Sequence, residues 1–362
     1  MGLTDRAWIL ITGATGYLGR FLVRELSYQG FRLILLVRSR EKGEELLASL
    51  PTSSERVWIL RGDITLSQLG LSSDIYYSLS QKLGAIVHCA ALTKFNPSPI
   101  QAFRCNIIGT RNLLTLAQKA GQLSSFHYVS TAYVAGRRQG KIREDELDGR
   151  YGFNNLYEES KFLAECLLKQ YQRQHNAPVT IYRPSIIVSD LKTGSYWNNF
   201  GVYHFLVLLK RLSNHQPIRL SGNPEATKNL VPIDYATEAI TYILRNRQHW
   251  GKTYHLSLPQ PPTLGLLEEV FNRTLGRRVV CLVTERDFQE KPRDRREAII
   301  SHQTRLYQPY LLNEPVFDSS NTQAVLEESG ITSPVLDLET LVFLLSHAKG
   351  GSKNYAPARN LG

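Results

Sequence analysis

Short, mainly apolar runs alternate with longer amphipathic segments along the first half of the chain. Such runs are typical of strands that are buried on both faces of a sheet. We expect six strands, at residues 8–12, 31–37, 57–60, 85–88, 126–130 and 179–182. Apolar residues at helical spacing predict helices at residues 17–29, 41–50, 100–120 and 158–174. Strands that alternate with helices predict an α/β fold built on a doubly wound parallel sheet.

The pattern loosens after about residue 190, where longer loops carry Gly, Asn and Pro. Helices are expected at residues 234–247, 264–275 and 338–347, and the charge-rich stretch 287–305 predicts a solvated helix or a lid. We therefore expect a first domain over residues 1–190, a smaller substrate-covering region over 191–349 interleaved with the end of the sheet, and a flexible tail over 350–362.

A glycine turn joins the first expected strand to the first expected helix. Gly13 permits a tight bend, Gly16 lets the backbone approach a pyrophosphate, and Gly19 lets the helix pack closely on the sheet. The start of the helix offers free N–H groups and its positive dipole end to phosphates. The turn, which also contains Thr15, Tyr17 and Leu18, predicts a dinucleotide-binding site.

The end of the second strand bears on the choice of cofactor. NAD-binding proteins often have an acid there for the ribose 2′-hydroxyl, whereas this chain has Arg38 and no acid before Glu41. A guanidinium suits a 2′-phosphate through forked, charge-assisted hydrogen bonds. We expect NADP (NADPH), with Arg38 as the main contact and Arg40 as a second candidate. A solvated loop arginine is the alternative.

Two further strand ends carry candidate cofactor contacts. Asp63 follows the third strand, where its carboxylate can accept from an adenine amino group while Ile64 packs on the ring. A helix cap is the alternative role for Asp63. Ala90 and Ala91 follow the fourth strand and are small enough for the backbone to lie against a dinucleotide, or else they only fill the core.

Tyr157 and Lys161 stand four residues apart near the start of an expected helix, so their side chains share one face. A free phenol has a pKa of ~10. A nearby ammonium and the positive charge of a nicotinamide favour tyrosinate and move this pKa toward the working pH. Lys161 can also hold the nicotinamide ribose, and Thr131, after the fifth strand, can place a hydroxyl on a substrate carbonyl oxygen. The alternative is that Tyr157 and Lys161 are merely an exposed pair on the surface of the helix.

Composition limits the class of partner. The net charge of +11 reflects either a cationic surface that aids solubility or an acidic ligand, such as a phosphorylated cofactor, coenzyme A, an acidic carrier protein or anionic lipid. The basic residues are scattered without interleaved aromatics, so no nucleic acid is expected. The histidines and the four cysteines are also scattered, so we expect no metal site and buried free thiols.

The same features predict a cytoplasmic protein. Residues 1–6 are short and polar, unlike a signal peptide. The longest apolar stretch, 200–209, contains His204 and is too short to span a bilayer. Peripheral membrane contact and a homodimer are left open.

These motifs, in this order, resemble the extended branch of the short-chain dehydrogenase/reductase superfamily. The resemblance covers about residues 8–240 and also includes Asn106, Gly109-Thr110, Val129-Ser130-Thr131 and Arg183-Pro184-Ser185. Within that superfamily the chain is most similar to thioester reductase-like and fatty acyl reductase (male sterility type) domains. The segments that carry this similarity are 36–38, 88–91, 128–134, 159–165, 183–188 and 231–235.

The resemblance implies a Rossmann fold, catalytic roles for Thr131, Tyr157 and Lys161, and a cofactor contact at Pro184. It further implies that NADPH reduces an acyl thioester, carried on CoA or on an acidic carrier protein, to an aldehyde or an alcohol. Thr131 and Tyr157 would stabilise the developing oxyanion. The aromatic and apolar residues between Tyr196 and Leu212, including Trp197 and Phe200, favour an apolar acyl slot, with a core helix as the alternative.

Two other functions stay open. One is a sugar-nucleotide epimerase or dehydratase, or a hydroxysteroid-type dehydrogenase, on the same fold. Arg38 argues against the epimerases, which recycle a tightly held NAD. The other is a non-enzymatic NADP-sensing scaffold, against which the presence of both Tyr157 and Lys161 argues.

Overall fold

A computed structural model of the chain describes residues 7–50, 54–94, 97–196, 201–212, 214, 216–312 and 314–347. Several features of the sequence analysis lie outside the described residues: the start at 1–6, Trp197 and Phe200 in the proposed slot, and the tail at 350–362.

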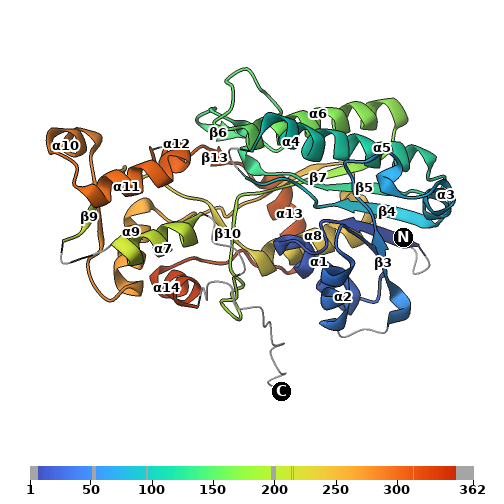
Figure 1. Cartoon of the computed structure of the whole chain (residues 1–362), viewed down its shortest axis with the longest axis horizontal. Helices are drawn as coiled ribbons and strands as arrows, with labels where there is room; N and C mark the ends of the chain where they lie inside the picture. The colour runs from blue at the N-terminus through green and yellow to red at the C-terminus, as the bar shows by residue number, and fades with distance from the viewer. Residues whose placement is uncertain are drawn as a thin grey trace.

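A seven-stranded parallel sheet lies at the centre of the larger part of the molecule (Figure 1). Its order is β11-β7-β5-β4-β1-β2-β3, and every neighbouring pair is parallel. The strands are β1 (Trp8–Thr12), β2 (Arg32–Val37), β3 (Val57–Arg61), β4 (Leu83–His88), β5 (Ser125–Val129), β7 (Val179–Pro184) and β11 (Thr253–Leu256). The expected doubly wound α/β fold and its six strands are confirmed.

The seventh strand was not anticipated. β11 comes from the second half of the chain, yet it pairs with β7 from Thr253 opposite Ile181 to Leu256 opposite Pro184. Its four residues, Thr-Tyr-His-Leu, are too short and too mixed to give a periodic apolar signal. Its place is decided by pairing with a strand more than 70 residues earlier in the chain.

Helices cover both faces of the sheet because successive strand residues point to opposite sides. In β1, Ile9 and Ile11 belong to one apolar core, whereas Trp8 and Leu10 belong to the other. α1 (Tyr17–Tyr28) and α8 (Ile233–Arg245) pack together on the first face, and α3 (Ser73–Lys82), α5 (Gly109–Lys119) and α6 (Leu156–His175) cover the second (Figure 1). The remaining helices of this larger part are α2 (Arg40–Ala48), α4 (Pro99–Ala102) and α13 (Ser320–Ser329).

Two expected helices are interrupted in the structure. The segment 100–120 is divided into α4, a π-helical stretch at Phe103–Ile108, and α5. The segment 287–305 forms two helices, α10 (Glu285–Glu290) and α11 (Arg295–Thr304), because Pro292 between them cannot continue a helix. α3 and α13 were not anticipated.

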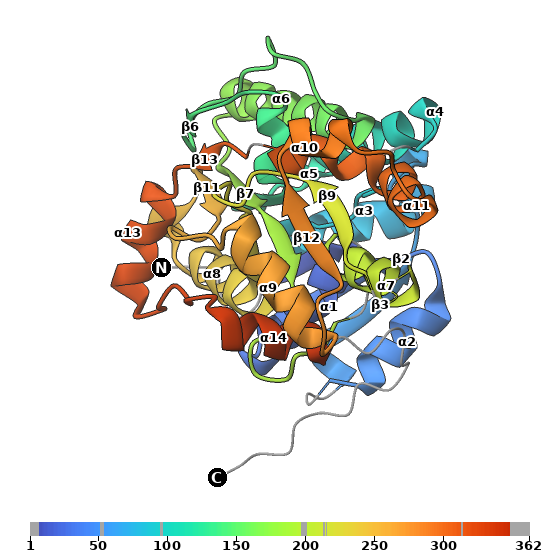
Figure 2. The same cartoon turned by 90° about the vertical axis from the view of Figure 1, so that its left-hand side faces the viewer.

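A smaller region forms one end of the molecule (Figure 2). It contains the parallel pair of β9 (Ile218–Ser221) and β12 (Val280–Val283), with the helices α7 (Val202–Leu212), α9 (Leu264–Thr274), α12 (Gln308–Leu312) and α14 (Leu338–Ser346). Two short parallel pairs connect it to the rest: β8 (Ile186–Val188) with β10 (Leu230–Pro232), and β6 (Lys141–Ile142) with β13 (Val316–Phe317). Residues of α7, α9 and α14 share one apolar core with α1 and α8.

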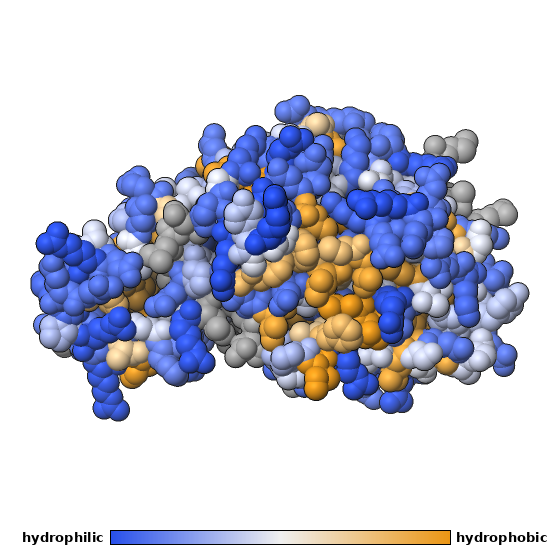
Figure 3. All heavy atoms as spheres, turned by 90° about the horizontal axis from the view of Figure 1, so that it is seen from above, coloured by the Kyte–Doolittle hydropathy of each residue, from blue (hydrophilic) through white to orange (hydrophobic). Residues whose placement is uncertain are grey.

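Seen from above, the molecule presents a patch of apolar side chains between polar ones (Figure 3). The elements on this side include α4 and α6 (Figure 1), and their neighbourhood carries the exposed side chains of Ile100, Phe103 and Leu163. Exposed apolar patches often mark interaction sites. The homodimer left open by the sequence stays a prediction.

Two simpler expectations can be compared with the structure. No helix among the described residues is long and apolar enough to cross a membrane. The four cysteines are free thiols, but each is only partly buried rather than fully buried as expected.

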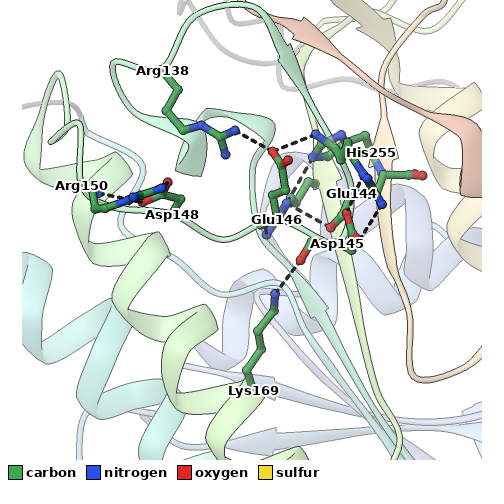
Figure 4. A network of polar contacts seen from close by, with 10 residues as sticks. Arg138, Glu144, Asp145, Glu146, Asp148, Arg150, Lys169 and His255 are labelled. Atoms are coloured by element: carbon green, nitrogen blue, oxygen red, sulfur yellow. Dashed lines mark hydrogen bonds and ion pairs between the residues drawn. The ribbon is translucent and has the colours of Figure 1, made fainter.

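A buried ion pair ties the strand β7 to the helix α6. The Arg183 guanidinium lies 2.7 Å from the Glu165 carboxylate, and both side chains are almost fully buried. Arg183 also donates to the backbone oxygens of Glu144 and Glu146. The Glu144 carboxylate in turn accepts from the backbone N–H of His255, in the unanticipated strand β11 (Figure 4). The pair therefore holds the loop before α6, the helix and two strands in one arrangement.

We predict that Arg183→Met lowers the free energy of unfolding by ~3–5 kcal/mol, because it leaves the Glu165 carboxylate buried without its partner. Arg150→Met is the matched control, since the Arg150–Asp148 pair has the same 2.7 Å separation but Arg150 is exposed. Loss of that exposed pair should leave the free energy of unfolding nearly unchanged. Urea unfolding of both variants measures the difference, and equal losses would contradict the role given to Arg183.

Candidate active site

The candidate residues from distant parts of the sequence meet in one cavity of about 1000 Å³. It lies at the carboxyl ends of the parallel strands, where open α/β sheets bind their ligands. All but one of the candidate catalytic and cofactor residues named from the sequence line it, the exception being Arg40: Gly13, Thr15, Gly16, Tyr17, Leu18, Gly19, Arg38, Asp63, Ile64, Ala90, Ala91, Thr131, Tyr157, Lys161 and Pro184. The structure thus brings them together, while their roles remain predictions.

The glycine turn has no room for side chains. Gly13 has a φ of +70°, and a Cβ there would lie 2.6 Å from the backbone nitrogen of Ala90. A Cβ at Gly19 would lie 2.1 Å from the Gly13 carbonyl oxygen. Gly16 is the N-cap of α1, and no side chain caps this helix start. The first turn of α1 therefore faces the cavity with its own backbone N–H groups, as a phosphate site requires.

The two arginines after β2 have different surroundings. Arg38 is exposed and lines the cavity. Arg40 lies in the first turn of α2 and forms an exposed ion pair with Glu44 at 2.8 Å. Arg40 is not among the residues that line the cavity. The geometry therefore favours Arg38 and disfavours Arg40 as a contact for a 2′-phosphate.

Asp63 has a structural partner as well as a place in the cavity. Its carboxylate accepts from the backbone N–H of Thr65 at 2.8 Å, which is a turn-capping contact. This contact engages one of its two oxygens. Ile64 beside it is nearly buried, and Asn112 holds its carbonyl with a hydrogen bond of 2.8 Å. The capping role is present, and it leaves one carboxylate oxygen for an adenine amino group.

Tyr157 and Thr131 both line the cavity and share a hydrogen bond. Tyr157 is in the first turn of α6, and the Asn155 side chain caps this helix by accepting from the Glu158 N–H at 3.0 Å. Thr131 is nearly buried and donates to the Pro184 carbonyl at 3.4 Å. Burial raises the pKa of Tyr157 to about 12, against which a hydrogen bond with Thr131 acts.

The raised pKa of Tyr157 differs from the lowering that the neighbouring Lys161 ammonium was expected to contribute. The Lys161 ammonium donates to the Val129 carbonyl at 2.7 Å and lies 4.0 Å from the centre of the Tyr128 ring. It is almost fully buried, and burial lowers its pKa to about 7, with the Glu165 carboxylate acting in the opposite direction. In the protein without a cofactor, desolvation of the phenol outweighs any lowering of the Tyr157 pKa by Lys161. The lowering expected with the charge of a bound nicotinamide stays a prediction.

The other half of the cavity is formed by the smaller region and is mainly apolar. From the segment Tyr196–Leu212, the side chains of Tyr196, Val202, His204 and Phe205 line it. Tyr203, Leu208 and Leu209 instead belong to the core. One edge of α7 thus lines the cavity while its other side packs in the core. The core-helix alternative therefore holds for part of the segment, and the acyl slot stays a prediction. Further apolar lining, which no pattern in the sequence indicated, comes from β9, α9 and β12: Leu220, Leu264, Leu267, Phe271, Val280 and Leu282.

A second polar cluster, formed by Lys228, Glu314, Tyr133 and Tyr310, was also not anticipated from the sequence. Lys228, from the loop before β10, lines the cavity and pairs with Glu314 at 3.3 Å. Tyr133 donates to the same carboxylate, and Tyr310 donates to the Glu158 carboxylate. Lys228 and Glu314 are 86 residues apart and belong to no motif, so nothing in the sequence pointed to them. Asn106 was named above for its place in the resemblance. Its side chain accepts a hydrogen bond from the backbone N–H of Leu92 and donates one to the backbone oxygen of Leu92.

Fold and site together define a class of protein. A doubly wound sheet with a glycine turn after β1, and a tyrosine–lysine pair on α6 at the same cavity, is the arrangement of a short-chain dehydrogenase/reductase. Residues 11–240 match the family model of the male sterility protein, an NAD-binding domain. The chain therefore belongs to this family.

Relatives and solved structures agree with that assignment. Carboxylic acid reductase of Mycobacterium tuberculosis (strain H37Rv) is 28% identical over 297 residues, which are 72% of this chain and 25% of that protein. Fatty acyl-CoA reductase 1 of Mus musculus is 30% identical over 271 residues, 62% of this chain and 52% of that protein. The chain thus spans about a quarter to a half of the length of these curated relatives.

Among solved structures, the terminal R domain from the myxalamid PKS-NRPS biosynthetic pathway is 29% identical, with a TM-score of 0.80 over 95% of this chain and 90% of that one. The UDP-glucose 4-epimerase of Thermotoga maritima, at 17% identity and a TM-score of 0.67 over 94% and 98% of the two chains, shows the shared fold alone. The family and the reductase relatives support an NAD(P)-dependent oxidoreductase.

We predict that the stability of the wild type rises with pH relative to Lys161→Met. The pKa of Lys161 falls from 10.5 to about 7 on folding, so the unfolded chain binds its proton more tightly. The resulting destabilisation is full below pH 7 and is relieved by about 1.4 kcal/mol per pH unit as the pH rises toward the unfolded value.

Urea unfolding of both proteins at several pH values measures this difference. Lys192→Met is the control, because it removes the ammonium of a lysine whose side chain is exposed rather than buried. A pH-independent difference for Lys161→Met would contradict the burial of a titrating ammonium.

Proposed function

We propose that this chain catalyses the NADPH-dependent reduction of an acyl thioester, carried on CoA or on an acidic carrier protein, to an aldehyde or an alcohol. The observation that carries the proposal is the shared cavity. Thr131, Tyr157 and Lys161 line it together with the glycine turn, and its other half is mainly apolar. Such a cavity can hold a dinucleotide beside an acyl chain, with the hydroxyl groups of Thr131 and Tyr157 between them.

The residues present fit a bound NADPH. The uncapped start of α1 at Gly16 would hold the pyrophosphate, and Arg38 the 2′-phosphate. The free oxygen of Asp63 and the side chain of Ile64 would contact the adenine, while Lys161 and Pro184 would lie at the nicotinamide end. When bound, NADPH supplies the hydride for the carbonyl carbon.

Thr131 and Tyr157 would act on the substrate oxygen. Their hydroxyl groups would donate hydrogen bonds to the thioester carbonyl, and these bonds would strengthen as negative charge develops there. A raised pKa keeps Tyr157 protonated in the protein by itself, so its phenol can give a proton to that oxygen. The resulting hemithioacetal would break its C–S bond to release an aldehyde and a thiol, and a second reduction would give the alcohol.

The charge and the lining support a thioester more than a sugar nucleotide. A sugar nucleotide needs a second phosphate site, and Lys228, in the half of the cavity formed by the smaller region, already has its charge compensated by Glu314. The net charge of +11 suits the acidic groups of CoA or of a carrier protein. The name of one relative, fatty acyl-CoA reductase, agrees with a thioester substrate.

We predict that acyl-CoA supports NADPH oxidation with release of an equal amount of free thiol, followed with a colorimetric thiol reagent. Tyr157→Phe should lower turnover by about 100-fold or more, because it removes the proton donor and one oxyanion donor. Tyr171→Phe, on the same helix but facing the core, is the matched control and should keep full turnover.

The panel includes acyl-carrier protein, UDP-sugars and ketosteroids. NADPH oxidation on a sugar nucleotide or ketosteroid, without turnover of any thioester, would contradict the proposal and favour the rival enzyme classes. Cofactor binding without any turnover would favour the non-enzymatic scaffold.

We also predict that NADPH binds more tightly than NADH, and that Arg38→Ala weakens NADPH binding by ~1.5–3 kcal/mol while leaving NADH unchanged. Arg40→Ala is the matched control, since Arg40 is paired with Glu44 outside the cavity. Fluorescence titration of both cofactors gives the affinities. Equal or tighter binding of NADH by the wild type would show that the choice of cofactor was assigned wrongly.

A further inference from the structure

The buried lysine of the second polar cluster has unused hydrogen-bonding capacity. The side chain of Lys228 is only 5% exposed, and its ammonium lies 5.8 Å from the centre of the Tyr310 ring. Within the described part of the chain, Glu314 is its one hydrogen-bond acceptor. An ammonium has three N–H donors. Two donors of Lys228 are therefore available on the wall of the cavity.

Glu314 makes this ammonium suited to a neutral partner. Its carboxylate is 2% exposed and accepts from Lys228, from the Tyr133 hydroxyl and from the backbone N–H of Asn229. The ion pair is neutral as a whole, and its carboxylate is satisfied. A second anion at Lys228 would place two negative charges around one buried positive charge, which is costly in a poorly hydrated site. A carbonyl oxygen would need no such compensation.

The cluster adjoins the predicted oxyanion donors on two sides. Tyr133, which is bonded to Glu314, donates its backbone N–H to the Thr131 hydroxyl at 3.3 Å. Tyr310, whose ring lies against Lys228, donates to the carboxylate of Glu158, the neighbour of Tyr157 in α6. A thioester whose reacting carbonyl meets Thr131 and Tyr157 would therefore bring its next polar groups within reach of Lys228.

We infer that Lys228 is a specificity-determining residue that donates a hydrogen bond to a second, unreduced amide carbonyl of the thioester substrate. The inference rests on the proposed function. The amide can belong to the acyl group or to the pantetheine-like thiol arm, and both sources present the same acceptor. A site built to bond such a carbonyl discriminates against a substrate that lacks it, because the ammonium is then left without its partner.

Three synthetic thioesters of matched length separate these sources. Hexanoyl pentanethiol ester has no amide, hexanoyl N-acetylcysteamine ester has one in the thiol arm, and N-propanoylglycyl pentanethiol ester has one in the acyl group. The measured quantity is kcat/KM for each amide-bearing ester relative to the ester without an amide. For Lys228→Met, this ratio should fall by about 10- to 100-fold, as expected for a lost charged hydrogen bond. Lys192→Met, an exposed lysine outside the cavity, should keep the wild-type ratio.

The pattern of loss identifies the source of the carbonyl. A fall confined to the N-acetylcysteamine ester assigns the carbonyl to the thiol arm, and a fall confined to the glycyl ester assigns it to the acyl group. An unchanged ratio for both esters would overturn the inference, as would an equal loss of activity on all three.

Lys228→Met leaves Glu314 without its cation and can destabilise the protein. The double variant Lys228→Met/Glu314→Gln removes both charges together and should show the same fall in the ratio. Its thermal unfolding measures whether it is folded. If the double variant is folded and retains the wild-type preference, Lys228 does not contact the substrate.

Binding of unreactive thioethers with the same three amide patterns gives a readout that needs no turnover. Calorimetry should show that Lys228→Met weakens only an amide-bearing thioether. If no thioester is reduced but this selective weakening is found, the proposed function fails and the role of Lys228 stands. If thioesters are reduced but Lys228→Met discriminates in neither assay, the proposed function stands and the inference fails.

Discussion

The close contact of three backbone segments at Gly13 is the constraint on which the site depends. A Cβ at this position would lie 2.6 Å from the Ala90 nitrogen, and one at Gly19 would lie 2.1 Å from the Gly13 oxygen. Without side chains here, the end of β1, the start of α1 and the end of β4 meet directly, and the uncapped helix start faces the cavity. Every other candidate contact for a dinucleotide is arranged around this contact, because parallel strands bring their carboxyl ends to the same edge of the sheet.

Buried cations organise the rest of the site, and each is balanced in a different way. Arg183 has a full carboxylate partner in Glu165, which locks α6 to β7. Lys161 has a backbone carbonyl and an aromatic ring, so burial lowers its pKa to about 7. Among the described residues, Lys228 has one carboxylate partner, which leaves two of its donors unused. Buried charge is costly unless it is paired.

Local motifs in the sequence predicted the cofactor half of the site, whereas the substrate half came from long-range contacts. Gly13 to Gly19 are consecutive in the chain, and Tyr157 and Lys161 are one helical turn apart, so spacing alone brought each group together. Lys228 and Glu314 are 86 residues apart, and β11 finds β7 across a similar distance. No periodicity connects such residues. Burial of the Tyr157 phenol, which raises its pKa in the protein without a cofactor, was not foreseen for the same reason, since it depends on surrounding elements.

The sequence by itself determined the parallel α/β sheet and the glycine turn, because apolar runs, helical spacing and tight bends are properties of neighbouring residues. It also determined which strand ends carry Arg38, Asp63 and Thr131. The tertiary structure alone decided which side chains are desolvated, how their charges are balanced, and which apolar residues of β9, α9 and β12 close the cavity. Desolvation and ion pairing depend on everything within a few ångströms of a group, and in a folded chain most of those atoms come from residues far away in sequence.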